Sequence, residues 1–158
     1  MINKVFTKLL KSNIQIPVLV EPFDFCKHFF KGNGYGVKFS FVDPDIEKLG
    51  LDYPIAPHAG YSLSSYNLVG NHTLKEMLKG FQSGYENNFA TIWNLLLKQP
   101  NGEGGELLVN GDANIFFFEN GYASNVHWHL VGWDVFVSEV SSESFKWYDG
   151  LQIFVHNS

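Results

Sequence analysis

Residues 121–140 constrain the fold of this chain more than any other stretch. They read GYASNVHWHLVGWDVFVSEV, and apolar side chains occupy both the odd and the even positions along much of this run. A strand that is covered on both faces has such a pattern, whereas a strand with one solvent face alternates between apolar and polar residues. We therefore predict one long strand over residues 125–140, which would form the central strand of a sheet.

The residues on either side of this strand predict antiparallel neighbours. Residues 106–109 and 115–119 flank an Asn-Gly-Asp turn, and Asn-Gly is the strongest short signal of a β-hairpin. A short strand at residues 145–148 and a last strand at residues 151–156 are separated by Asp-Gly. The C-terminal half therefore predicts an antiparallel β-meander of about 4–6 strands.

The N-terminal half predicts helices, one long loop and a short strand over residues 37–42, where apolar and polar residues alternate. Apolar residues recur over residues 2–12 with the spacing of an amphipathic helix. Capping residues precede two further helices, over residues 73–79 and 89–98, and Gly or Pro follows each of them. Residues 51–70 are rich in Pro, Gly and Ser and predict an irregular loop. The predicted fold is a single α+β domain over residues 1–158, in which the C-terminal meander packs against N-terminal and central helices.

Composition indicates a folded cytoplasmic protein. Apolar residues make up 45% of the 158 residues, charged residues make up 17%, and Cys26 is the single cysteine. The opening residues, MINKVFTKLLKSN, lack the apolar core of a secretory signal, and no window is long and apolar enough to span a membrane. We expect a cytoplasmic location and no membrane partner.

The charged residues argue against a nucleic-acid partner. The formal net charge is −5, and all eleven basic residues are Lys, although Arg is the usual reader of phosphate and guanine. The acidic residues are concentrated late in the chain, because residues 99–158 contain one Lys and eight acidic residues. A field of this sign attracts basic partners.

Two histidines in the long stretch have the spacing of metal ligands. His127 and His129 would point to the same face of a strand, and imidazole suits Zn, Fe, Cu or Ni. Gly121, five intervening residues and His127-Trp128-His129 resemble the first half of the cupin motif, over about fourteen residues. That resemblance implies a metal bound by both histidines, an acid in the place of Asp134, and a third histidine on a later strand, here His156.

The alternation of a regular strand separates the acid from the two histidines. In one continuous strand Asp134 would face away from His127 and His129, so the metal interpretation requires a β-bulge at Gly132. The alternative function is therefore a small metal-dependent, cupin-like enzyme with His127, His129, Asp134 and His156 as ligands.

The interpretation that we favour from sequence is a non-enzymatic binding protein. Acidic residues interleave with large aromatic ones in the C-terminal third, which suits the capture of a basic protein. An acidic chain without a catalytic motif fits the general profile of bacterial toxin-immunity proteins, which bind and block a partner such as a nuclease toxin domain. We expect no cofactor and no catalytic residue, and a partner surface formed by Glu119, Tyr122, Asp134, Glu139, Glu143, Trp147, Tyr148 and Asp149.

Overall fold

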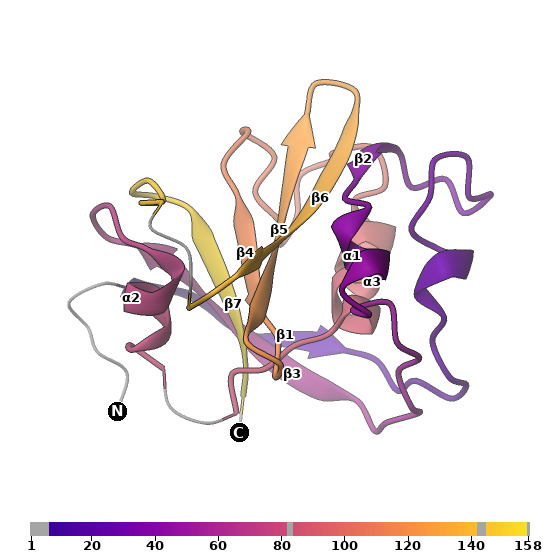
Figure 1. Ribbon diagram of the computed structural model, residues 1–158, viewed down its shortest axis with the longest axis horizontal. Helices are drawn as coiled ribbons and strands as arrows, with labels where there is room; N and C mark the ends of the chain where they lie inside the picture. Colours follow the sequence, from indigo (N-terminus) through magenta and orange to yellow (C-terminus); the bar gives the residue numbers. More distant parts are fainter. Residues whose placement is uncertain (1–6, 82–83, 142–144, 158) are drawn as a thin grey trace.

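The computed structural model describes residues 7–81, 84–141 and 145–157, and a single seven-stranded sheet dominates it (Figure 1). The strand order is β1-β3-β7-β4-β5-β6-β2. The pairs β4–β7 and β2–β6 are parallel, and the other four neighbouring pairs are antiparallel. The strands are β1 (Thr7–Ile16), β2 (Phe39–Val42), β3 (Tyr61–Leu68), β4 (Asn114–Phe117), β5 (Tyr122–His129), β6 (Gly132–Glu139) and β7 (Gln152–His156).

The predicted fold class is therefore wrong. The sheet is mixed rather than an antiparallel meander, and three of its seven strands, β1, β2 and β3, come from the N-terminal half. β2 lies in the segment that predicts a strand, whereas β1 and β3 lie where a helix and a loop were predicted. The α-helices of the described residues are short: α1 (Asp45–Lys48), α2 (Leu74–Leu78) and α3 (Phe89–Lys98). None of these helices is long and apolar enough to cross a membrane.

Strand β1 lies where an N-terminal helix was predicted. The apolar residues of the predicted helical stripe that are described, Leu9 and Leu10, are 55% and 51% exposed, whereas Ile14 and Ile16 are each only 2% exposed. The alternation of Ile14 and Ile16 belongs to a strand, which pairs with β3 from Thr7–Leu68 to Ile16–Tyr61. Residues 1–6 of the predicted helix lie outside the described residues.

Strand β3 lies inside the segment that was predicted to be an irregular loop. It pairs with β1 on one side and with β7 on the other. Its sequence, YSLSSYNL, is rich in Ser, yet Ser64 and Ser65 are buried. Its backbone hydrogen-bonding groups are paired on both sides, with β1 and with β7. This segment therefore forms a strand although it contains fewer apolar residues than a typical buried strand.

The predictions for α2 and α3 are confirmed in position. Thr73 accepts a hydrogen bond from Glu76 N, and the Glu76 carboxylate accepts one from Thr73 N, which forms a capping box at the start of α2. Asn88 caps α3 through a hydrogen bond from Thr91 N. In both cases the local sequence carries the signal, because a cap needs only residues within one helical turn.

The two faces of the sheet carry separate cores, and Figure 1 shows α2 and α3 on opposite sides of the strands. On the face that we call the α3 face, Phe116, Trp133 and Phe154 belong to one core with Ile92 and Leu96 of α3. The opposite side, the α2 face, has a smaller core, formed by Ile115, Phe117, Ile153, Leu74 and Met77 among others. On β5 and β6 this smaller core includes only Ala123, because the other residues of that face are polar, such as the buried Asn125 and Asp134, or only partly buried, such as His127 and Phe136.

The predicted long strand 125–140 is two strands joined by a tight turn. β5 ends at His129, β6 begins at Gly132, and these two residues pair with each other. Leu130 has a φ of 54°, in the left-handed region, and Val131 N donates a hydrogen bond to His129 O. The hairpin lies close to one edge of the sheet, not at its centre, which β4 occupies. A two-residue turn normally contains Asn or Gly, so the apolar pair Leu130-Val131 gave no signal of a turn in the sequence.

The predicted hairpin 106–119 is also replaced by other contacts. β4 pairs with β5 and β7, and residues 106–109 form no strand. Instead, Leu108 N donates to the Asn114 side chain, and Gln152 Nε2 donates to Glu106 O. Side chains thus form hydrogen bonds with backbone groups of residues 106–109, although the sequence of this segment resembles that of a strand.

Candidate functional site

The β5–β6 hairpin brings Asp134 next to both histidines of the long stretch. His127 and Asp134 are directly opposite each other in the register of the two strands. Asp134 Oδ2 lies 3.2 Å from His127 Nε2 and 3.5 Å from His129 Nδ1. The turn at residues 130–131 reverses the chain, so the acid reaches the histidines without the β-bulge that one long strand would require.

Gly132 serves a different purpose from the one that was predicted. A Cβ atom at this position would lie 2.6 Å from Ser40 N and 3.0 Å from the carbonyl carbon of Phe39. The glycine thus permits the close approach of β2 to the start of β6, where Trp133 N donates to Lys38 O.

The environment of this cluster favours a neutral His127. Burial lowers the pKa of His127 from its ordinary value, and the neighbouring His129 lowers it further, while the carboxylate of Asp134 acts in the opposite direction. The side chain of Asp134 is only 10% exposed, and its Oδ1 atom has no hydrogen-bond partner among the described residues. One oxygen of this nearly buried carboxylate thus has no donor among the described residues.

The fourth residue of the predicted metal set lies elsewhere. His156 is on β7, and its ring contacts that of Tyr61 in a tilted arrangement, with 4.1 Å between centroids, on the α3 face of the sheet. His127 and His129 lie on the α2 face. Among the residues that the structure describes, no group of three His, Cys, Asp or Glu side chains is arranged to hold a metal ion. The metal interpretation stays a prediction.

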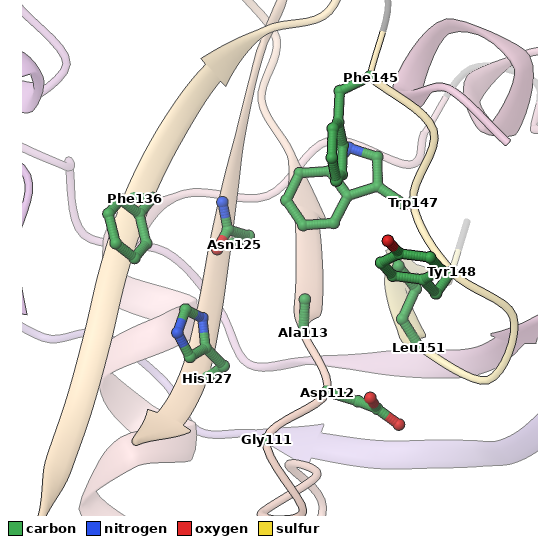
Figure 2. Close-up of a pocket in the computed structure, with 10 residues that line it drawn as sticks. All are labelled: Gly111, Asp112, Ala113, Asn125, His127, Phe136, Phe145, Trp147, Tyr148 and Leu151. Atoms are coloured by element: carbon green, nitrogen blue, oxygen red, sulfur yellow. The ribbon is translucent and has the colours of Figure 1, made fainter. Parts of the chain in front are cut away.

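A groove of about 390 Å³ opens on the uncovered part of the α2 face. One wall is formed by the β5–β6 hairpin and the other by residues 145–151, with the chain before β4 between them (Figure 2). We call this feature the aromatic groove. Its lining residues are Gly111, Asp112, Ala113, Asn125, His127, Phe136, Phe145, Trp147, Tyr148 and Leu151.

Ring contacts organise both walls of the aromatic groove. On the hairpin side, the His127 and Phe136 rings stack at 5.6 Å between centroids. On the other side, Phe145 meets Trp147 edge-on at 5.3 Å and Tyr148 at 6.5 Å. Figure 2 shows these two sets facing each other across the groove. Such packed rings present a large apolar surface at little cost in conformational entropy.

Backbone hydrogen bonds to the segment before α2 hold the second wall in place. Trp147 N donates to His72 O at 2.7 Å, and His72 N donates to Trp147 O at 3.0 Å. Asp149 Oδ1 accepts a hydrogen bond from Gly70 N, and Asp149 N donates to the Asn71 side chain. Asp149 therefore fixes the loop that carries Trp147 and Tyr148.

The structure divides the predicted partner surface into two groups. Trp147 and Tyr148 line the aromatic groove, and Asp134 adjoins it through His127. Tyr122 and Glu139 pair with each other at the opposite end of the hairpin. Glu119 lies at that end as well, in the turn between β4 and β5. Glu143 lies outside the described residues.

Several groove residues were not predicted from the sequence. Phe136 shares the face of Asp134 because it is two residues further along the same strand, so strand alternation could have identified it. Phe145 and Asp112 carry no comparable signal, because their positions depend on how two separate loops pack.

The chain matches no known family model, no curated protein and no solved structure in comparisons with known proteins. Its function has to be inferred from the surfaces described above.

Proposed function

We propose that this protein is a non-enzymatic binding module that inhibits a basic protein partner stoichiometrically, as bacterial toxin-immunity proteins do. The observation that supports this proposal is the aromatic groove, whose lining contains four large aromatic residues and one acidic residue but no Lys. Interfaces are enriched in such aromatic residues, which supply most of the binding free energy when a partner buries them.

The rings of the groove are accessible to a partner. Phe145 and Tyr148 are 51% and 69% exposed, although a large apolar side chain is normally covered in an isolated domain. The exposed Phe41 of the edge strand β2 extends the apolar surface, because its ring lies 5.0 Å from that of Phe136. Exposed aromatic rings that lie next to one another in this way are typical of a binding site.

The charge near the groove favours a cationic partner. Asp112 lines the groove, Asp134 lies behind His127, and Asp149 is exposed beside Tyr148. An Arg or Lys side chain in the groove would meet the carboxylate of Asp112 and the faces of aromatic rings, and both attract cations. The single cysteine suits a reducing compartment, so we place this activity in the cytoplasm.

The proposal can be tested by affinity capture followed by an inhibition titration. The wild-type protein, the double variant Phe145→Ala/Tyr148→Ala and the control Val20→Ala are each used to capture proteins from the source cells. Val20 is a suitable control because it is exposed and lies outside the groove. We expect a basic protein that the wild type and Val20→Ala retain, that the double variant loses, and that elutes at high salt.

The captured protein must then lose its own activity in proportion to the amount of binding protein added, with an end point at one equivalent. Loss of capture in the Val20→Ala control, or a retained partner whose activity is unchanged at one equivalent, would contradict the proposed function.

A further inference from the structure

A second hollow, of about 400 Å³, lies at the other end of β4 from the aromatic groove. Its walls come from residues 53–58, from the residues just before α3, and from Glu119 after β4. The side chains that matter for its chemistry are those of Tyr53, His58, Glu86, Asn87 and Glu119. We call it the acceptor hollow, because its unpartnered polar atoms are hydrogen-bond acceptors.

Asn87 leaves a buried oxygen without a partner. The residue is only 5% exposed, and its Nδ2 atom donates to Phe154 O at 3.0 Å and to Tyr85 O at 3.2 Å. These two carbonyl groups fix the orientation of the amide, because a flipped amide would place its oxygen against both of them. Oδ1 therefore faces away from these carbonyl groups, and it has no hydrogen-bond partner among the described residues.

His58 supplies a second acceptor. Its Nδ1 atom lies 2.7 Å from the carbonyl oxygen of Ala59, which can only accept, so Nδ1 carries the proton of the neutral ring. The other nitrogen, Nε2, then has a free lone pair, and it too is buried without a partner among the described residues. The two unpartnered buried atoms of this hollow are thus both acceptors.

The charged residues of the acceptor hollow are acidic, so they also favour a hydrogen-bond donor. Glu86 and Glu119 line it, and no Lys does. Burial raises the pKa of Tyr53, and the negative charge of Glu119 raises it further, so the charge of Glu119 acts across the hollow. An anion at the start of α3 would be repelled by both carboxylates, and the Thr91 N–H there already donates to Asn88.

We propose that the acceptor hollow binds a guanidinium group. A guanidinium carries a positive charge and five N–H donors in one plane, so it matches both the unpartnered acceptors Asn87 Oδ1 and His58 Nε2 and the negative charge of the two carboxylates. The group could belong to a small molecule or to an arginine side chain of another protein. This site is separate from the aromatic groove and does not depend on the proposed function.

Titrations followed by the backbone amide signals of the protein test this proposal. The probes are methylguanidinium, tetramethylammonium, free arginine and an arginine blocked at both ends as N-acetyl-arginine amide. We expect saturable shifts at Glu86, Asn88 and Glu119 with methylguanidinium, and no saturable shift there with tetramethylammonium, which has the same charge but no N–H group. Tighter binding of the blocked arginine than of free arginine would indicate a peptide source, and the reverse order a small molecule.

Matched variants show whether the shifts report this hollow. Glu119→Gln removes one carboxylate from an exposed turn, and we expect it to weaken methylguanidinium binding by about tenfold, which is the loss of one hydrogen bond between charged groups. Glu47→Gln, an exposed residue of α1, is the control and should leave the affinity unchanged. Equal shifts with tetramethylammonium, unchanged affinity in Glu119→Gln, or saturable shifts confined to other residues would each overturn the proposal.

Discussion

Asp134 Oδ2 lies 3.2 Å from His127 Nε2 across the β5–β6 hairpin, and His129 approaches the same oxygen atom at 3.5 Å. One carboxylate thus serves two imidazoles that are two residues apart on the neighbouring strand. The ionisation of His127 depends on both neighbours, which act on it in opposite directions.

Substitutions of these two neighbours should move the pKa of His127 in opposite directions. Asp134→Asn removes a negative charge that favours the imidazolium, so we expect a lower pKa for His127. His129→Gln removes a positive charge that disfavours the imidazolium, so we expect a higher pKa. The ring C–H signals of His127, followed by NMR through a pH titration, measure both changes. Shifts of the same sign in both variants would contradict this account of the cluster.

The same residue should make folding stability depend on pH. Because the pKa of His127 is lower in the folded protein than its ordinary value of 6.5, the unfolded chain binds more protons between those two values. The stability contributed by the neutral ring is complete above pH 6.5 and is lost as the pH falls through that window to the folded pKa. Urea unfolding of the wild type and of His127→Gln at several pH values measures the effect. The slope in this window should be smaller in the variant.

Gly132→Ala should destabilise the attachment of β2. The added Cβ would lie 2.6 Å from a backbone nitrogen of the neighbouring strand, which is too close without a shift of one of the two strands. We expect a loss of about 1–3 kcal/mol in the free energy of unfolding, measured by urea denaturation. Gly104→Ala is the control, because a Cβ at that position meets no atom within 4 Å, and it should change stability by less than about 0.5 kcal/mol.

Metal removal tests the other interpretation of His127 and His129. Since the proposed function needs no metal, we expect dialysis against a chelator to leave the free energy of unfolding and the capture of the partner unchanged. Elemental analysis of the purified protein provides the second measurement. A stoichiometric metal ion that disappears in His127→Ala would contradict the binding-module proposal and would support the enzyme alternative.

The sequence predicted local features of this fold better than its strand pairing. The caps Thr73 and Asn88 lie within one turn of the helices that they begin, so their signals are complete in a short window. The parallel pairs β4–β7 and β2–β6 join segments that are far apart in the chain, and alternation within one strand does not reveal its partner. For that reason the positions of α2 and α3 were predicted correctly, whereas the N-terminal strand β1 and the pairing of the sheet were not.

In the candidate site, too, local features were predicted better than the contacts between segments. His127, His129 and Asp134 were identified together from their residue types, but their contact depends on a turn at Leu130 and Val131 that contains neither Gly nor Asn. Trp147 and Tyr148 were expected on a partner surface, and both line the groove. Alternation along β6 places Phe136 on the same face as Asp134, but only the reversal of the chain at residues 130–131 brings that face beside His127.

The position of β7 has a consequence for how the protein folds during its synthesis. β7 is made after the other six strands of the sheet, yet it lies between β3 and β4. Until it is made, the pair β1–β3 and the group containing β4, β5 and β6 have no strand to join them, and each presents an open edge at the place where β7 will insert. Open edges of this kind promote association between nascent chains. The facing edges of β3 and β4 therefore stay unpaired until residues 152–156 have been made.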